Sequence, residues 1–503
     1  MRELDMNRRT FLSGAALAVA GCVAGRPRPK LLKAGDRLNM GFVGVGGKGV
    51  QDLLEFVRCG ENPVCLCDVD RGLMDIALGH LKKAGFDTAK IRCYADFRKM
   101  IDANPHMDAV CVSTPDHMHA APAVYAMRAG MHVYVQKPLV RTLWELRRFE
   151  EVARETGVIT QMGNQGSSGK VFRRNVEVLQ AGVIGEVRDV HMWMDHPVGM
   201  WLQGNAARAA LAGPADPVPA DLDWDLWLGI CAARPYKHTP LSDDPHVNSR
   251  YDKSRIRIYH EFGWRGLLDF GSGVLGDQAC HSMNLPFRGL EFGALRQARC
   301  VRCEERNDVT YPARAEVELV FGARPSRARP GVTLPETRFH WYEGKYVPDK
   351  ALMEPFRPIY GNKWNNCGCL IIGSKGLMFS PGIYGQQSFV VMNGEKKPLS
   401  VLKHPACTGV PETLPRRPEA LMDGQYNEFG DAIRGTTPVI ESVHSRCYSD
   451  IAHSVPMLEA MLVGVAAERV ESDALAWDHA AQRFDNAAAN ALIRPYIRPG
   501  WEF

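Results

Sequence analysis

Apolar stretches alternate with amphipathic stretches over the first third of the chain. Strand-like apolar runs occur within residues 38–56, 62–70, 107–119 and 130–140. Helical patterns end the first of these runs and occupy residues 72–84 and 120–129. Strands that alternate with helices are typical of a parallel, doubly wound sheet with helices on both faces. An α/β domain is therefore predicted for this part of the chain.

The rest of the chain is patterned differently. Residues 332–344 and 387–402 read as strands with turns, whereas residues 425–435 and 454–470 are helical in pattern. Residues 203–223 and 237–254 are rich in Gly, Pro and Asp and are predicted to be loops. No internal repeat and no low-complexity segment is evident.

The first 30 residues have the pattern of an export signal. Arg8 and Arg9 precede an apolar run from Phe11 to Ala24, which is too short to span a membrane. A basic start, a short apolar run and small residues are typical of a signal peptide, and the paired arginines resemble a twin-arginine signal. Two processing sites compete: "AVA" at 18–20 suits ordinary cleavage, whereas "VAGC" resembles a lipobox in which Cys22 carries lipid.

Composition excludes some classes of protein. The 503 residues are 45% hydrophobic and 23% charged, and the net charge is only +4 without a basic stripe, which argues against a nucleic-acid partner. Several of the 14 cysteines sit in apolar runs, so most are predicted to be free thiols. Cys300 and Cys303 lie in strand-like sequence and would point to opposite faces, so no metal site is predicted.

A glycine cluster follows the first apolar run. Gly44, Gly46 and Gly49 form G-x-G-x-x-G, with Gly47 among them, between a predicted strand and a predicted helix. This arrangement brings the backbone and a helix N-terminus close to a pyrophosphate. Asp68 ends the next strand and suits a ribose diol, so NAD is favoured over NADP, although Arg71 lies nearby.

Three later side chains are candidates for the chemistry. Lys137 ends a strand before Pro138, and partial burial there would lower its pKa for proton transfer; the alternative is a lysine on a solvated loop. Asp277 and His281 are four residues apart, so on a helix the carboxylate could orient the imidazole as a general base. The alternative is a helix N-terminal Asp with a packed His.

These motifs, with "STPDHMH", "QKP" and G-x-x-x-D-x-x-x-H, come in the order of the Gfo/Idh/MocA oxidoreductases, which the chain resembles from residue 38 onward. The closest resemblance is to exported, twin-arginine-tagged members. It implies a Rossmann domain at 38–160. It also implies a C-terminal α/β substrate and oligomerisation domain at 161–503, with an open, mostly antiparallel sheet, and a homo-oligomer.

The resemblance also implies site residues. Lys137, Asp277 and His281 are then the catalytic group, and Thr114, His119 and Asn164 join the glycines, Asp68 and Lys137 at the cofactor. One position departs from the pattern: Gln136 stands where the family often has Glu, which is expected to alter the pKa of Lys137 or the cofactor contact.

Five of the ten tryptophans fall between residues 193 and 264. Aromatic faces suit sugar rings as well as cores, so one or two are predicted to be sugar platforms. The substrate candidates are Trp193, His196, Tyr259 and Arg265.

Three functions remain open on the sequence. The first is an NAD-dependent oxidoreductase that acts on a carbohydrate hydroxyl and recycles a tightly bound cofactor. The second is an NAD-dependent glycoside hydrolase that works by transient oxidation at C3, elimination and water addition. The third is a non-catalytic sugar-binding surface protein. Export in the folded state would carry the cofactor to the periplasm or to the lipid-anchored surface of the cell envelope.

Overall fold

The computed structural model describes residues 29, 32–198, 200–238, 258–260, 262–361, 366–416, 424–436 and 447–503. The predicted export signal, with Cys22, lies outside them. The first six strands are β1 (Asn39–Val43), β2 (Asn62–Cys67), β3 (Arg92–Tyr94), β4 (Ala109–Val112), β5 (His132–Gln136) and β6 (Thr160–Gly163). They form one parallel sheet in the order β3-β2-β1-β4-β5-β6.

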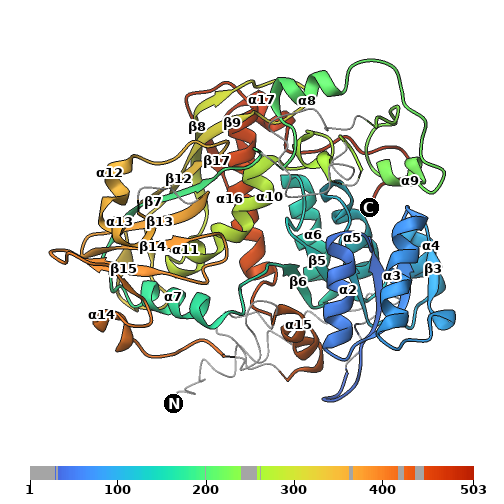
Figure 1. Ribbon diagram of the computed structural model, residues 1–503, viewed down its shortest axis with the longest axis horizontal. Coiled ribbons are helices and arrows are strands. Elements are labelled where there is room, and N and C mark those ends of the chain that lie inside the picture. Colours follow the sequence, from blue (N-terminus) through green and yellow to red (C-terminus); the bar gives the residue numbers. More distant parts are fainter. Residues whose placement is uncertain are drawn as a thin grey trace, which may run out of the picture.

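Both faces of this sheet are covered by helices. Met40 and Phe42 of β1 pack with one group of helices, whereas Val110 and Val112 of β4 join the core on the opposite face. The first face carries α2 (Lys48–Arg58), α3 (Arg71–Lys83) and α15 (Gln425–Arg434), and the second carries α4 (Phe97–Ala103), α5 (Ala120–Arg128) and α6 (Leu143–Thr156). The predicted doubly wound α/β domain is therefore confirmed (Figure 1).

The turn between β1 and α2 depends on glycine. Gly44 has φ of +80°, and a Cβ there would lie 2.8 Å from the backbone of Ser113. A Cβ on Gly49 would lie only 2.0 Å from the carbonyl oxygen of Gly44. The first turn of α2 therefore sits directly on the end of β1, at the edge of the sheet where ligands bind in this class of fold.

A second sheet of ten strands lies on the other side of the molecule (Figure 1). Its strands are β7 (Val187–Met194), β8 (Leu295–Glu304), β9 (Arg314–Phe321), β12 (Thr337–Tyr342), β13 (Cys367–Gly373), β14 (Gly376–Pro381), β15 (Phe389–Met392), β16 (Leu399–Ser400), β17 (Leu475–Asp478) and β18 (Arg483–Phe484). Their order is β16-β15-β14-β13-β7-β12-β9-β8-β17-β18. Only β7 and β12 pair in parallel, so the predicted, mostly antiparallel sheet is confirmed.

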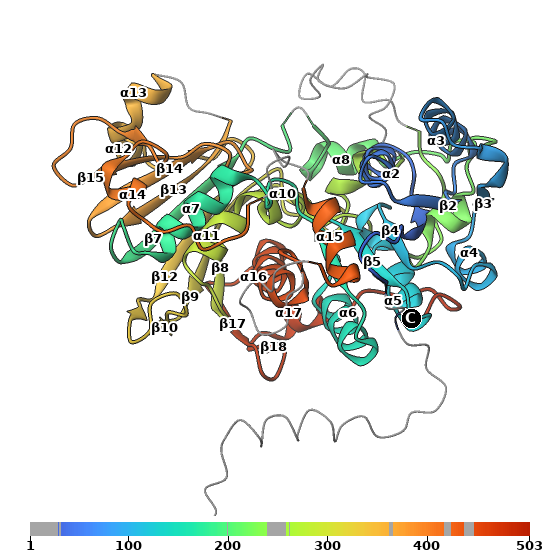
Figure 2. The ribbon, with the colours of Figure 1, turned by 90° about the horizontal axis from the view of Figure 1, so that it is seen from below.

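Two helices lie between the sheets, as Figures 1 and 2 both show: α10 (Gly273–Ser282) and α16 (Ile451–Arg469). Helix α16 contacts α6 and β6 on one side and β8 and β9 on the other. It is long and apolar enough to cross a membrane by composition, but most of it is buried inside the protein, as in a core helix.

The remaining short elements connect these layers. They are β10 (Arg324–Pro325) with β11 (Thr333–Leu334), the helices α7 (Lys170–Gln180), α8 (Gly204–Ala210), α9 (Trp224–Leu228), α11 (Asn284–Gly289), α12 (Lys350–Met353), α13 (Arg357–Tyr360), α14 (Pro405–Thr408) and α17 (Ala487–Ala491), and the 3-10 turns η1 (Thr88–Lys90), η2 (Asp116–Met118), η3 (Gly263–Gly266) and η4 (Glu354–Phe356).

The last residues of the chain return to the first domain. The backbone N–H of Trp144 on α6 donates to Ile493 (3.0 Å), and the Arg98 guanidinium lies 4.2 Å from the Trp501 ring centroid. Phe503 meets Trp144 edge-on, with ring centroids 5.5 Å apart. The C-terminal tail thus joins the two halves on the side of α4 and α6.

Three expectations need correction. Strand β6 ends at Gly163, three residues past the expected boundary at 160, because it pairs with β5. The expected loop at 203–223 contains α8. Cys300 and Cys303 are not on opposite faces, because a register shift in β8 between Cys300 and Arg302 interrupts the alternation. A hydrogen bond from Cys300 lowers the pKa of Cys303 to about 6.

The described residues contain neither a disulfide nor a cluster of metal ligands. None of the described cysteines forms a disulfide. No group of three or more His, Cys, Asp or Glu side chains in this part of the chain is placed to hold a metal ion.

Replacing Gly49 by Ala is expected to lower the free energy of unfolding by about 3 kcal/mol, because the new methyl group meets a backbone oxygen that cannot move freely. Gly79→Ala in α3 is the matched control, since a Cβ there meets nothing within 4 Å. The control should gain up to about 1 kcal/mol from helix propensity. Urea unfolding measures both, and equal stability of the two variants would contradict the expectation.

Candidate functional site

The loop after β1 and the end of β2 form one polar corner. Asp68 Oδ2 accepts from the backbone N–H of Val45 (2.7 Å), and Oδ1 accepts from that of Asp70 (3.0 Å). Burial raises the pKa of Asp68, and these hydrogen bonds oppose the rise. Each carboxylate oxygen retains a lone pair for a ribose hydroxyl.

The same corner fits a pyrophosphate. Gly47 is the N-cap residue of α2, and no side chain caps this end of the helix. A Cβ at Gly47 would meet nothing within 4 Å. The turn is therefore open at Gly47, next to the N-terminus of α2, where the helix dipole favours an anion. A dinucleotide with an unmodified ribose diol matches this pattern of donors and acceptors.

Asn164 follows β6 at the same edge of the sheet. It is fully buried, and neither its Oδ1 nor its Nδ2 has a hydrogen-bond partner among the described residues. Because buried amides are normally satisfied, Asn164 is suited to a polar ligand group. This placement agrees with its predicted position near the nicotinamide end, which stays a prediction.

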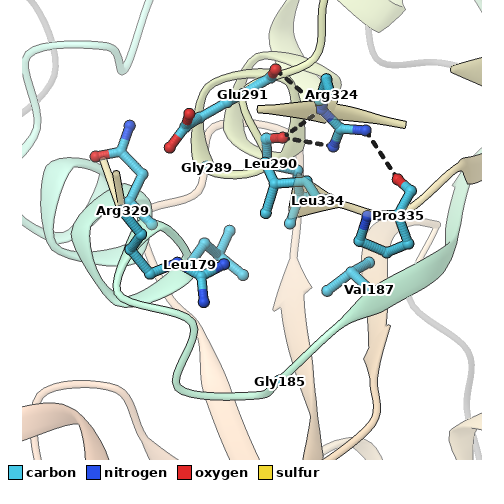
Figure 3. A pocket seen from close by; sticks show the side chains of 11 residues that line it. Leu179, Gly185, Val187, Gly289, Leu290, Glu291, Arg324, Arg329, Leu334 and Pro335 are labelled. Carbon is cyan, nitrogen blue, oxygen red and sulfur yellow. Dashed lines mark hydrogen bonds between the residues drawn. The ribbon is translucent and has the colours of Figure 1, made fainter. Parts of the chain in front are cut away.

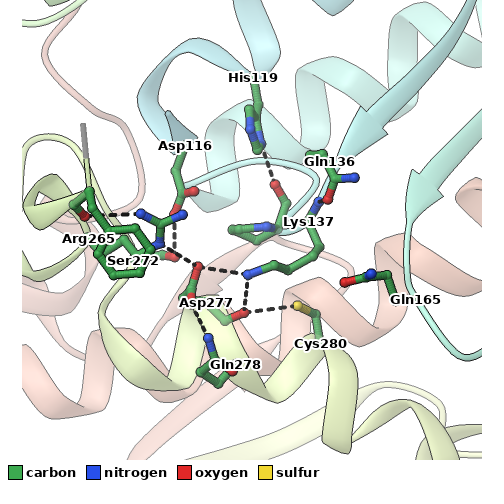
Figure 4. A network of polar contacts seen from close by, with 12 residues as sticks. Asp116, His119, Gln136, Lys137, Gln165, Arg265, Ser272, Asp277, Gln278 and Cys280 are labelled. Carbon is green, nitrogen blue, oxygen red and sulfur yellow. Dashed lines mark hydrogen bonds and ion pairs between the residues drawn. The ribbon is translucent and has the colours of Figure 1, made fainter. Parts of the chain in front are cut away.

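An ion pair joins the two halves of the molecule beside this edge (Figure 4). Lys137 Nζ, just after β5, donates to Asp277 Oδ1 (2.9 Å) and to the Asp277 carbonyl (3.1 Å) on α10. Arg265 Nε lies 3.6 Å from the same Oδ1. Of the residues predicted as catalytic or substrate-binding, the structure brings these three together.

The charges of this cluster fix its protonation. Burial would lower the pKa of Lys137, but the charge of Asp277, the neighbouring Cys280 and the hydrogen bond to Asp277 together raise that pKa above its ordinary value. Burial would raise the pKa of Asp277, yet Lys137 and Arg265 hold it well below its usual range. The prediction of a lowered Lys137 pKa was therefore wrong, because the carboxylate partner could not be read from the sequence around Lys137.

His281 does not pair with Asp277, contrary to expectation. The Asp277 carboxylate is occupied by Lys137, Arg265 and Gln278, and no hydrogen bond among the described residues joins it to His281. The His281 ring instead meets Tyr384 edge-on, with centroids 4.9 Å apart, and its Nδ1 has no partner in the described structure. Burial lowers the pKa of His281 well below its ordinary value, so the ring is neutral at neutral pH.

Asp116 belongs to the cluster and was missed. Its buried carboxylate accepts from Ser272 Oγ (2.7 Å), the residue that precedes α10. Burial, and then the charge of Asp277, raises the pKa of Asp116 to about 7. The signal in the sequence was its place in the "STPDHMH" loop after β4, where a carboxylate meets the ligand edge.

Gln136 has a structural reason to replace Glu. Its Nε2 donates to both carboxylate oxygens of the fully buried Asp52 (2.9 and 2.8 Å). Ser113 Oγ and Tyr426 OH also donate to Asp52, and Lys48 Nζ lies 3.0 Å from it. A Glu at position 136 would face this carboxylate with a like charge.

His119 and Thr114 hold the backbone of the site. The two ring nitrogens of His119 lie 2.6 Å from the Pro138 carbonyl and 2.8 Å from the Thr114 carbonyl, and Thr114 Oγ1 donates to Met118. Burial lowers the pKa of His119 to about 4. Neither ring nitrogen is left for a cofactor, so His119 ties the loop after β4 to the loop that carries Lys137.

Two predicted substrate residues are buried in aromatic packing. Trp193 is buried in β7 and stacks on Phe379, with planes 4° apart and centroids 5.9 Å apart. Tyr259 is buried among Trp224, Trp227 and Phe270. Aromatic neighbours bury both rings, and the assignment of these two residues to the substrate stays a prediction. His196 pairs with Asp195 (3.0 Å) and lies against Trp201, outside the Lys137 cluster.

A separate small pocket lies in the second domain (Figure 3). Arg324 dominates it and donates to the carbonyl groups of Leu290, Glu291 and Pro335. Burial lowers the pKa of Arg324 to about 10. The Arg324 guanidinium is already hydrogen-bonded to backbone carbonyl groups. The Lys137 cluster is therefore the better candidate for the functional site. Its lining residues are Leu179, Gln180, Gly185, Val187, Gly289, Leu290, Glu291, Arg324, Arg329, Leu334 and Pro335.

Comparison with known proteins agrees with this geometry. Residues 38–164 match the family described as "Oxidoreductase family, NAD-binding Rossmann fold". The "Glycosyl hydrolase family 109 protein" of Shewanella baltica (strain OS195) is 25% identical over 230 residues, covering 39% of this chain and 50% of that protein. The corresponding "family 109 protein 1" of Shewanella sp. (strain ANA-3) matches to the same extent. The chain thus spans about half the length of these relatives.

Two solved structures share the fold over most of the chain. The WlbA dehydrogenase from Chromobacterium violaceum, in complex with NADH and UDP-GlcNAcA, has a TM-score of 0.55 at 13% identity, covering 90% of this chain and 99% of that one. An inositol dehydrogenase homolog from Azotobacter vinelandii, complexed with NADH and myo-inositol, has a TM-score of 0.54 at 17% identity, covering 89% and 99%. At these identities the likeness establishes the fold.

The glycine turn, Asp68 and the parallel sheet define a dinucleotide-binding Rossmann domain. The match of residues 38–164 to the NAD-binding Rossmann family of oxidoreductases agrees with the resemblance that the sequence motifs carry.

Gln136→Glu is expected to lower the free energy of unfolding by about 3 kcal/mol, because it buries a second carboxylate against Asp52. The double variant Asp52→Asn/Gln136→Glu should recover part of the loss, since an amide again faces a carboxylate. Denaturant unfolding at neutral pH measures both. A Gln136→Glu protein as stable as the parent would contradict the expectation.

Asp116→Asn is expected to change how stability depends on pH. The raised pKa of about 7 means that the folded protein holds a proton which the unfolded chain releases near its ordinary value of 3.8. The parent should therefore lose stability as pH rises from 5 to 7, by at most about 1.4 kcal/mol per pH unit from this group. The variant lacks this contribution, and urea unfolding at pH 5, 6, 7 and 8 compares the slopes. Identical slopes would disprove the assignment.

Proposed function

We propose that this protein is an NAD-dependent enzyme that acts on a carbohydrate hydroxyl and recycles a tightly bound cofactor. The observation that carries the proposal is the buried Lys137–Asp277 pair, placed beside Asn164 at the ligand edge of an NAD-binding domain. The filled cluster argues against the third reading, a non-catalytic sugar-binding surface protein.

NAD, when bound, supplies an acceptor for hydride. The chain's own residues then manage the proton and the charge. Lys137 is held as an ammonium by Asp277 and can stabilise an alkoxide oxygen. His281 is neutral and has a free Nδ1, so it can accept the hydroxyl proton without first losing one.

Asp116 supports a second proton transfer. With a pKa raised to about 7 it can hold or release a proton near neutral pH. His119 positions Lys137 through the Pro138 carbonyl, which keeps the ammonium at one place relative to α10. Arg265 lies beside Asp277, and we assign its guanidinium to stabilise negative charge that develops on the substrate.

A redox-neutral glycosidase is the second candidate, favoured by the relatives named as family 109 glycosyl hydrolases. In that cycle a ring hydroxyl, which we place at C3, is oxidised, the C2 proton is removed, and the C1 substituent leaves. Water then adds and the C3 ketone is reduced, so glycoside and water are the only compounds consumed. The additional C2 proton requires a second titratable group, and Asp116 provides one.

Location and assembly are part of the same proposal. Arg8 and Arg9 would direct the folded, cofactor-loaded protein through the twin-arginine route to the periplasm, and lipid on Cys22 would tether it to the envelope. Because no nicotinamide pool is maintained there, an internally recycled cofactor suits that location. The ten-stranded sheet is the surface through which we expect a homo-oligomer to form.

The test uses purified protein without added cofactor. Denaturation should release NAD(H), identified by chromatography and mass. The intact protein is then given nitrophenyl glycosides in heavy water: nitrophenol release with deuterium at C2 and no net NADH selects the glycosidase, whereas NADH absorbance without cleavage selects the dehydrogenase. Protein that neither contains nor takes up NAD(H) would refute the proposal.

Lys137→Ala is expected to reduce either activity by at least about a hundredfold, because the alkoxide loses its charged partner. Lys83→Ala is the control, since Lys83 is exposed on α3. Full activity in the Lys137 variant would remove the assigned role.

A further inference from the structure

A segment distant in the sequence packs against the loop that follows Asp68. Arg71 opens α3 three residues after Asp68, and its Nη2 donates to Asp221 Oδ1 and to the Ala220 carbonyl, each at 3.1 Å. The segment around Asp221 precedes α9, about 150 residues further along the chain. Asp221 thus pairs with a basic side chain that stands three residues after Asp68 in the sequence.

Backbone pairing holds Asp221 in place. The N–H of Arg71 donates to the Asp221 carbonyl, and the N–H of Asp223 donates to the Val69 carbonyl, both at 2.9 Å. Asp70 and Leu222 form an antiparallel bridge between these bonds. The Arg71 and Asp221 side chains are 73% and 66% exposed, so a free ion pair there would contribute little. Because the backbone pairing already holds the two residues next to each other, only side-chain freedom is lost when the pair forms.

A third contact closes the corner. His260 Nε2 lies 2.9 Å from Asp70 Oδ2, and Asp70 Oδ1 accepts from the N–H of Leu73. Both oxygens of Asp70 are therefore occupied. Asp70 is therefore not available to Arg71, and Arg71 pairs with the carboxylate of Asp221.

These contacts bear on the choice between NAD and NADP. The two cofactors differ by a phosphate on the ribose diol that Asp68 is suited to accept, and an arginine beside that position is the usual means of binding the phosphate. Arg71 has the chemistry and the place in the sequence for that role, but its guanidinium is already paired. Asp221 thus removes the charge that a 2′-phosphate would need.

We propose that Asp221 is a specificity-determining residue, which excludes NADP by holding Arg71 away from the ribose of the bound dinucleotide. This inference rests on the proposed function, since it requires a dinucleotide at Asp68. It concerns a residue outside the cofactor turn.

The experiment measures which nucleotide the protein retains. The full chain is first stripped of its bound nucleotide on activated charcoal. It is then incubated with equal concentrations of NAD⁺ and NADP⁺ and desalted, and the retained nucleotides are released and quantified by chromatography and mass. Asp221→Asn keeps the backbone bridge and removes the charge. It should raise the retained ratio of NADP⁺ to NAD⁺ about tenfold, which corresponds to about 1.4 kcal/mol.

Asp225→Asn is the matched control. Asp225 lies four residues further on, and its carboxylate pairs with Arg498 of the C-terminal tail (2.5 Å) rather than with the Asp68 corner. It should leave the ratio unchanged. The double variant Arg71→Ala/Asp221→Asn should lose the gain, because the gain acts through Arg71.

The outcomes separate this inference from the function on which it rests. NAD⁺ retained by all variants with an unchanged ratio in Asp221→Asn overturns the inference alone, and so does a gain that survives removal of Arg71. An unaltered protein that retains neither nucleotide refutes the proposed function. Arg71→Ala alone gives a test that does not depend on Asp221: a loss of NADP⁺ binding in it would show that Arg71 is already available and would overturn the inference.

Discussion

The contact between Lys137 and Asp277 is the interaction on which the site depends. It joins the end of β5 in the parallel sheet to α10, which lies between the two sheets. A buried ammonium and a buried carboxylate are each costly alone, so each half of the molecule supplies the charge that makes the other tolerable. Arg265 lies 3.6 Å from the same carboxylate, and the charge of that carboxylate adds to the effect of burial in raising the pKa of Asp116.

Local pattern was enough to predict the first domain and several positions in the site. The alternation of apolar and helical runs predicted the doubly wound sheet, and the spacing of Gly44, Gly46 and Gly49 before Asp68 predicted the dinucleotide corner. These features are encoded within a few tens of residues of one another. Lys137 and Asp277 were singled out one by one, from their places at the end of a strand and within a motif.

What could not be predicted depends on contacts across the chain. The pKa of Lys137 is set by a residue 140 positions away, so burial alone gave the wrong direction. His281 was assigned to Asp277 by helix spacing, but that spacing says nothing of the lysine that takes the carboxylate first. Trp193 and Tyr259 were assigned to the substrate by residue type, and the aromatic packing that buries both rings could not be read from the sequence. The sequence alone showed only that Gln136 lacks the charge of a Glu. The reason, its hydrogen bonds to the buried Asp52, depends on a contact across the chain.

The C-terminal tail has a consequence for how the molecule can move. Its contacts with Trp144 and Arg98 span from the second half of the chain to α6 and α4. A hinge motion that moved the two sheets apart would have to break the contacts of this tail with the first domain. These include the ring contacts of Trp501 and Phe503. We therefore expect the tail to restrict hinge motion between the two sheets.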